Sequence, residues 1–96
     1  MKATLRPEAE AGIEDTARWY EERRKGLGKE FLDEVLHSLG NIEDNPELYA
    51  RVYGDTRRAM MNRFPFGVFY LLEAEGVVVV AVMHASRNPA QWKDRT

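Results

Sequence analysis

The sequence has no cysteine among its 96 residues. It therefore cannot form a disulfide framework, a thiolate nucleophile, a cysteine zinc site or an iron–sulfur centre. A chain without disulfides is suited to a reducing compartment, and we expect it in the cytoplasm. Histidine is scarce too, with two residues in the whole chain, so the sequence predicts neither a metal centre nor a cofactor.

Long apolar runs are also lacking. The longest one, Val77–Met83, is far shorter than the roughly 20 residues of a membrane-spanning helix. The first residues, 1–6, show no apolar core of a signal peptide, so we expect an intracellular protein without a membrane partner. The length fits a single domain over residues 1–96, because two halves would each approach the ~40-residue limit for independent folding. A hydrophobic fraction of 44% excludes general disorder.

The small net charge of −2 conceals an asymmetry between the two halves of the chain. Residues 1–50 hold seven basic and twelve acidic side chains (−5), whereas residues 51–96 hold seven and four (+3). Nearly all of the basic residues in the second half are arginines. Such a distribution marks either a face for an anionic partner or ordinary surface scatter, and charge alone favours the second.

Apolar residues in the first half recur at the spacing of two helices. The first helix is predicted over residues 7–24, since Pro7 suits a first turn and Gly26 a helix end. The second follows Gly28 and ends at Asn45-Pro46, because proline cannot continue a helix. Its apolar stripe consists of Phe31, Val35, Leu39 and Ile42. The short connection favours an antiparallel helical hairpin.

The remaining segments are typical of β-strands. A short extended piece covers residues 3–5, and further strands are predicted over 57–62, 66–73 and 77–83. The last of these is continuously apolar, as expected of a central strand covered on both sides. The order β-α-α-β-β-β predicts an α+β fold in which the helical hairpin packs on one face of a mainly antiparallel sheet.

The segment after the last predicted strand offers the most chemistry. His84 can act as a general acid or base near neutral pH, and Arg87 can bind a phosphate or carboxylate. The same segment also has a structural interpretation, in which His84 caps the sheet and Trp92 covers the edge of the core. The residues alone favour the structural interpretation.

Three arginines, Arg57, Arg58 and Arg63, flank the first strand of the second half. They can contact phosphates or protect a sheet edge against aggregation. Because adjacent strand residues point to opposite faces, Arg57 and Arg58 cannot both belong to one patch. On the first helix, Trp19 and Tyr20 are predicted as core or partner-facing residues, with core the simpler choice.

Taken together, the segments 57–70, 77–82 and 84–89 resemble the ParE/RelE superfamily. These proteins are the toxins of bacterial type II toxin–antitoxin systems, also called plasmid stabilisation proteins. The resemblance extends over nearly the whole chain and implies a small antitoxin partner whose C-terminal segment wraps the toxin in a heteromeric complex. Trp19, Tyr20 and Phe31 are our candidates for the antitoxin-binding surface, provided that they are not wholly buried.

The two branches of the superfamily imply different targets. ParE-like members are associated with poisoning DNA gyrase, and RelE-like members cleave messenger RNA on the ribosome. Here Gly67–Phe69 stand where the nuclease branch carries an arginine, and the C-terminal catalytic tyrosine is missing. We therefore expect a ParE-like, growth-inhibiting toxin that binds a protein target. The target-binding candidates are Arg57, Arg58, Arg63, Arg87 and Trp92.

Two alternatives stay open at this point. One is a RelE-like ribosome-dependent mRNA endoribonuclease, in which Arg87 and His84 would be the catalytic residues. The other is a degenerate member that binds its antitoxin without toxicity.

Overall fold

A computed structural model of the protein describes residues 1–86. Its elements are β1 (Ala3–Leu5), α1 (Pro7–Arg23), α2 (Leu27–Asp44), β2 (Arg51–Tyr53), β3 (Thr56–Met60), β4 (Phe66–Glu73) and β5 (Gly76–His84). The predicted α+β class and the helical hairpin are confirmed. Neither helix in the described part is long and apolar enough to cross a membrane.

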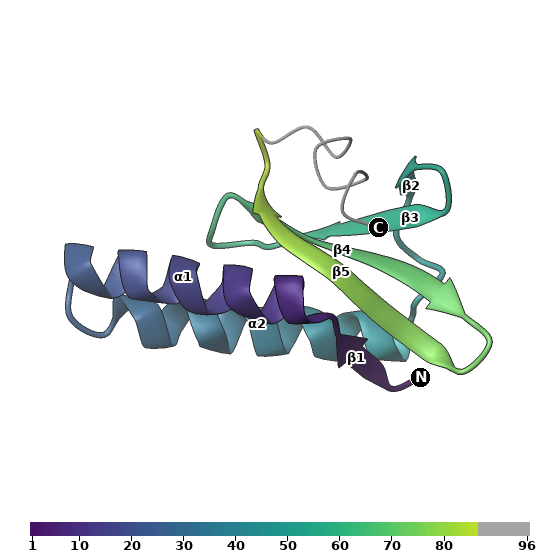
Figure 1. Cartoon of the computed structure of the whole chain (residues 1–96), viewed down its shortest axis with the longest axis horizontal. Helices are drawn as coiled ribbons and strands as arrows, with labels where there is room; N and C mark the ends of the chain where they lie inside the picture. The colour runs from purple at the N-terminus through teal and green to yellow at the C-terminus, as the bar shows by residue number, and fades with distance from the viewer. Residues whose placement is uncertain (87–96) are drawn as a thin grey trace.

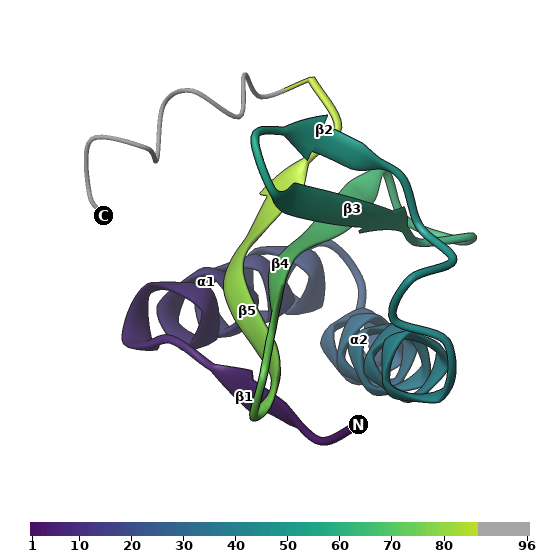
Figure 2. The same ribbon diagram turned by 90° about the vertical axis from the view of Figure 1, so that its right-hand side faces the viewer.

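The strands form one sheet in the order β1-β5-β4-β3-β2 (Figure 1). β1 pairs with β5 in parallel, while the other neighbouring strands are antiparallel. The sheet is strongly twisted, and α1 and α2 lie side by side on one of its faces (Figure 2). The parallel pair joins the first and last strands, so the sheet is mixed rather than wholly antiparallel.

β2 was not predicted from the sequence. It has three residues and no buried side chain, so it lacks the apolar alternation by which a strand is recognised. Its partner β3 ends at Met60, two residues before the predicted end. The amide of Met61 donates to the carbonyl of Phe66 (2.9 Å), and this hydrogen bond closes the β3–β4 turn just beyond the last strand pair, Met60–Gly67.

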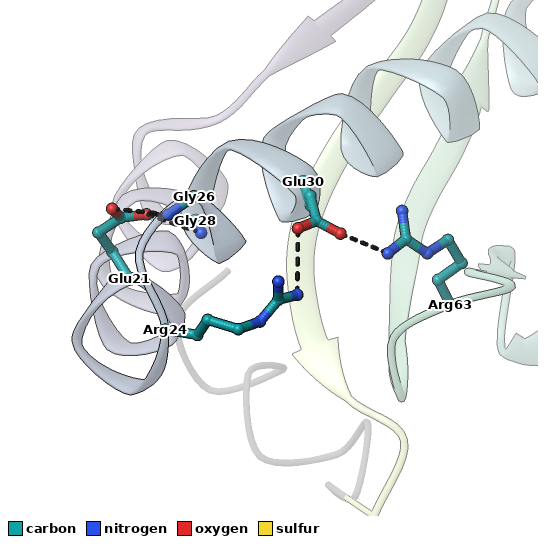
Figure 3. Close-up of polar contacts among 6 residues, drawn as sticks. All are labelled: Glu21, Arg24, Gly26, Gly28, Glu30 and Arg63. Atoms are coloured by element: carbon teal, nitrogen blue, oxygen red, sulfur yellow. Dashed lines mark hydrogen bonds and ion pairs between the residues drawn. The ribbon is translucent and has the colours of Figure 1, made fainter.

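The turn between the helices depends on two glycines and one carboxylate. Gly26 has a φ of 88°, a conformation that favours glycine. The Glu21 carboxylate of α1 accepts hydrogen bonds from the amides of Gly26 and Gly28 at 3.0 Å (Figure 3). These amides belong to the start of α2, which has no side-chain cap of its own. The hydrogen bonds from Gly26 and Gly28 lower the pKa of Glu21 below its ordinary value.

A bulge explains why β5 is apolar along almost its whole length. Phe69 pairs with Ala81 and Tyr70 with Val79, so Val80 is an extra residue in the ladder. Both Val80 and Ala81 therefore pack with Phe69 away from the helices. Tyr70 and Val79 pack instead in the main core beneath α1 and α2. β5 is therefore covered on both faces, as the sequence predicts.

Candidate functional site

The strand pairing separates the adjacent arginines of β3. Arg57 lies opposite Tyr70, whose side chain packs in the core beneath the helices. Arg58 lies opposite Phe69, which packs on the other face of the sheet. Since directly paired residues point to the same side, Arg57 and Arg58 lie on opposite faces, as the sequence predicted.

Arg57 holds the segment that follows α2. Its guanidinium donates to the carbonyl oxygens of Tyr49 (2.7 Å) and Glu47 (3.3 Å). Nearby, the hydroxyl of Tyr70 donates to the carbonyl of Pro46 at 2.6 Å, and burial raises the pKa of Tyr70. Together these side chains attach the loop before β2 to the sheet. Arg57 is thus engaged in a structural contact.

A hollow of about 610 Å³ lies beside this anchor. It is lined by Glu47, Arg51, Asp55, Arg57, Leu71, Leu72 and Glu73. Two arginines stand among three carboxylates in this lining, so both signs of charge are present and the excess is only one negative charge. We assign no ligand to this hollow.

Arg63, in the β3–β4 loop, is bound to α2. Its guanidinium donates to Glu30, whose other carboxylate oxygen accepts from Arg24 at 3.1 Å (Figure 3). The hydrogen bond from Arg63 is the main cause of a lowered pKa of Glu30. One turn further along α2, Glu34 accepts from the backbone amide of Asn62 at 3.0 Å. Two carboxylates of α2 therefore fix the loop that carries Arg63.

Arg58 differs from Arg57 and Arg63 because its guanidinium makes neither a hydrogen bond nor an ion pair with a residue in 1–86. It belongs to what we call the outer sheet face, the side of the sheet away from the helices. This face consists of Arg58, Met60, Leu71, Val78 and Met83 around the buried residues Phe69, Val80 and Ala81. It is a mainly apolar surface with one cation.

Gly67 shapes the centre of this face. A β-carbon at Gly67 would lie 3.0 Å from Cγ of Arg58 and 3.1 Å from Sδ of Met60. The absent side chain thus leaves room for both residues to lean over β4. Met60 remains substantially exposed, with 41% of its surface accessible. In the sequence, Gly67–Phe69 stand where the nuclease branch carries an arginine; in the structure, the small Gly67 makes room for Arg58 and Met60, which only the cross-strand register reveals.

A second surface lies on the helix side of the sheet. Four rings follow one another from α1 to β5, and we call them the ring row. Their centroid separations are 5.1 Å for Trp19–Tyr20, 6.2 Å for Tyr20–Phe66 and 5.3 Å for Phe66–His84. The guanidinium of Arg23 lies 3.9 Å from the Trp19 ring centroid, in a cation–π contact.

The ring row is accessible at its two ends. Trp19 is 49% exposed and His84 is exposed, while Tyr20 and Phe66 are half-buried. Tyr20 and Phe66 rest on the fully buried ring of Phe31. Trp19 and His84 are thus parts of one surface, although the sequence predicts separate roles for them.

Phe31 is a correction to the predicted antitoxin-binding set. It has no exposed surface and packs between Tyr20, Phe64 and Phe66. A partner can reach only exposed atoms, so Phe31 supports the ring row from beneath and makes no contact itself. Its place in the apolar stripe of α2 already favoured a core position.

His84 is held by its own turn. Its Nδ1 accepts a hydrogen bond from the amide of Ser86 (3.1 Å) and lies 2.8 Å from the Ser86 hydroxyl. In the neutral ring, this arrangement leaves the proton on Nε2. The other predicted catalytic residue, Arg87, lies outside the described residues, as does Trp92. Within residues 1–86 no group of three or more histidine, aspartate or glutamate side chains is arranged to hold a metal ion.

A comparison with models of protein families identifies the family of this chain. A family model described as the ParE toxin of the type II toxin–antitoxin system, parDE, matches residues 3–89. A solved structure of a chromosomal ParDE toxin–antitoxin system from P. aeruginosa is similar, with a TM-score of 0.78 at 10% sequence identity. The alignment covers 88% of this chain and 95% of that one. At this identity the likeness shows the fold alone. No curated protein sequence matches the chain.

Proposed function

Since this chain belongs to the ParE toxin family of type II toxin–antitoxin systems, we propose that it inhibits growth by binding a protein target and that a cognate antitoxin neutralises it. The family match over residues 3–89 is the observation that carries the toxin role. DNA gyrase is the target that we propose, and the cytoplasm is where the toxin acts.

The contacts of the arginines support binding rather than RNA cleavage. A nuclease needs cations that are available to stabilise charge at the scissile phosphate. Arg57 is bonded to two backbone carbonyls and Arg63 to Glu30, so neither guanidinium is available without breaking a structural contact. Arg58 lies on the outer sheet face, opposite the face that carries His84 beside Phe66. These three arginines therefore do not converge on one reaction centre.

The ring row is our proposed antitoxin-binding surface. Half-exposed aromatic rings are effective anchors for a partner, because they bury a large area with few rotatable bonds. Trp19 and His84 lie at the two ends of the row, with Tyr20 and Phe66 between them. An extended or helical apolar segment of the antitoxin would lie along these rings.

The outer sheet face is our proposed target-binding surface. It combines Arg58, whose guanidinium makes no ion pair with a residue in 1–86, with exposed apolar side chains such as Met60. An apolar patch with one cation favours a protein surface that carries a carboxylate at its rim.

Two measurements test this function. Expression of the chain without an antitoxin should arrest growth, and the purified chain should inhibit supercoiling by DNA gyrase. Arg58→Ala should weaken both effects, while Arg18→Ala, which changes an exposed cation on α1, should leave them unchanged. Full supercoiling at saturating toxin would exclude gyrase as the target. Ribosome-dependent mRNA cleavage would instead assign the chain to the nuclease branch, and absence of growth arrest would mark a degenerate member.

A further inference from the structure

Arg23 is the cation that lies against the ring row. Its guanidinium is 3.9 Å from the centroid of the Trp19 ring. An arginine stacked on an aromatic face is held in place by the ring, while the N–H groups at the edge of its plane stay able to donate. Within residues 1–86 the Arg23 guanidinium makes no ion pair and donates no hydrogen bond. Arg23 is therefore a positioned donor whose hydrogen-bonding capacity the described residues do not use.

The helical positions of α1 place Arg23 on the same side of Trp19 as Tyr20. At about 100° per residue, Arg23 lies about 40° from Trp19 in the direction of Tyr20. Asp15 and Glu22 lie about 40° and about 60° from Trp19 in the opposite direction. The acidic neighbours on α1 therefore lie beyond the end of the ring row, whereas the cation lies on the row itself.

Other carboxylates near this end of the row already have partners. Asp15 pairs with Arg18 at 3.2 Å, and Glu30 of α2 accepts from two other arginines. Glu21 accepts from backbone amides of the turn between the helices. This end of the ring row thus combines exposed aromatic surface with one cation that makes no direct contact with a described carboxylate.

We propose that Arg23 is a carboxylate-binding site of the ring row, and that its ligand is an acidic side chain of the antitoxin segment that lies along the rings. The inference rests on the proposed function, since it takes the ring row as the antitoxin-binding surface. A carboxylate accepts two parallel hydrogen bonds from a guanidinium, and the support of Trp19 reduces the ordering that such a pair requires. Because the cation stands at the Trp19 end, the acid also fixes the direction in which the segment runs along the row.

A selection of short random peptides on the purified full chain tests this chemistry without the antitoxin. The peptides have blocked ends, so any carboxylate that they contribute is a side chain. Peptides that bind the chain but not Trp19→Ala are occupants of the ring row. They should carry an acidic residue beside apolar ones, and the same selection on Arg23→Glu should enrich lysine or arginine in its place.

The affinity of one selected peptide then locates the contact. Changing its acid to the matching amide should weaken binding about tenfold to the unmodified chain, but should have no effect on binding to Arg23→Gln. Arg23→Lys keeps the charge at the end of α1, yet it should also lose affinity because an ammonium cannot form the paired hydrogen bonds. Lys25→Gln removes an exposed cation two residues further along and is the matched control, which should keep the full effect of the acid.

Ring-row peptides without an acidic residue, or an acid whose effect is the same in Arg23→Gln, would overturn the inference and leave the ring row as an apolar surface alone. Selected peptides that do not depend on Trp19 would overturn both the inference and the ring row as a binding surface. Growth arrest by the chain is measured separately, so a failure of the toxin role is distinguishable from either result. Circular dichroism of each variant checks that α1 is retained, and the comparison of acid with amide on the unmodified chain requires no variant.

Discussion

Gly28 lies so close to Ala17 that a β-carbon on Gly28 would approach the carbonyl oxygen of Ala17 to 2.6 Å. The two helices are therefore in backbone contact at the hairpin, and the Glu21 carboxylate closes the same turn by accepting from the Gly28 amide. The hairpin in turn places Phe31 of α2 beneath Tyr20 of the ring row.

Gly28→Ala should therefore destabilise the protein by about 1–3 kcal/mol, because α1 and α2 must separate to admit the methyl group. Gly40, inside α2, has nothing within 4 Å of an added β-carbon, so Gly40→Ala should instead stabilise the fold by about 0.5–1 kcal/mol. Chemical denaturation of both variants at low concentration measures the difference. Equal effects of the two substitutions would contradict this account of the hairpin.

The lowered pKa values of Glu21 and Glu30 predict a stability that depends on pH in the acid range. In the unfolded chain both carboxyls titrate near their ordinary value of 4.5, whereas in the folded protein they hold their charge to lower pH. Their stabilising contribution is therefore complete above pH 4.5 and is lost as the pH falls through the lowered values. Thermal unfolding measured as a function of pH should show this loss.

Arg63→Gln isolates the part of this effect that belongs to Glu30. Without the guanidinium, the pKa of Glu30 should return towards its ordinary value, and the decline in melting temperature below pH 4.5 should become shallower. Arg18→Gln removes an exposed cation paired with Asp15 and serves as the control. Identical pH profiles for Arg63→Gln and the unmodified protein would refute the role of this contact.

Substitution of each arginine of β3 should distinguish a structural role from a role in target binding. Arg57→Ala removes the hydrogen bonds to Tyr49 and Glu47 and should cost about 1–2 kcal/mol of unfolding free energy. Arg58→Ala should change stability by about 0.5 kcal/mol or less but reduce growth inhibition. Denaturation curves and growth assays on the same pair of variants test both statements. Strong destabilisation by Arg58→Ala would show that it is part of the scaffold.

Substitutions at the ring row should likewise distinguish a residue that supports the fold from a residue that contacts the antitoxin. Phe31→Ala should cost about 3–5 kcal/mol, because it empties a fully buried site beneath three other rings. Trp19→Ala, at a residue that is 49% exposed, should cost about 1 kcal/mol or less. If the ring row binds the antitoxin, Trp19→Ala should weaken that complex in a titration of the purified proteins. Unchanged affinity in Trp19→Ala would remove the ring row as the binding surface.

The helices and four of the five described strands could be predicted because their signals are local. The apolar spacing from Phe31 to Ile42 and the proline after Asn45 determine α2 almost to the residue. The alternation of strand side chains was also sufficient to place Arg57 and Arg58 on opposite faces.

What could not be predicted depends on contacts between distant segments. Glu30 and Arg63 are 33 residues apart, and nothing near either one indicates the pairing. Trp19 and His84 were assigned to different roles because their shared surface exists only once α1 lies against β4 and β5. β2 was missed since its three residues are ordered mainly by pairing with β3.

The pairing of β1 with β5 joins Leu5 to Val79, almost the full length of the described chain. During synthesis the ribosome releases β1 first, and β1 then has no strand to pair with until β5 has been made. The sheet therefore cannot close on a partly synthesised chain. Neither the ring row nor the outer sheet face is complete before β5 has been synthesised, because both include residues of β5. An antitoxin that recognises these surfaces would then meet each new toxin molecule only at the moment when that molecule becomes able to act.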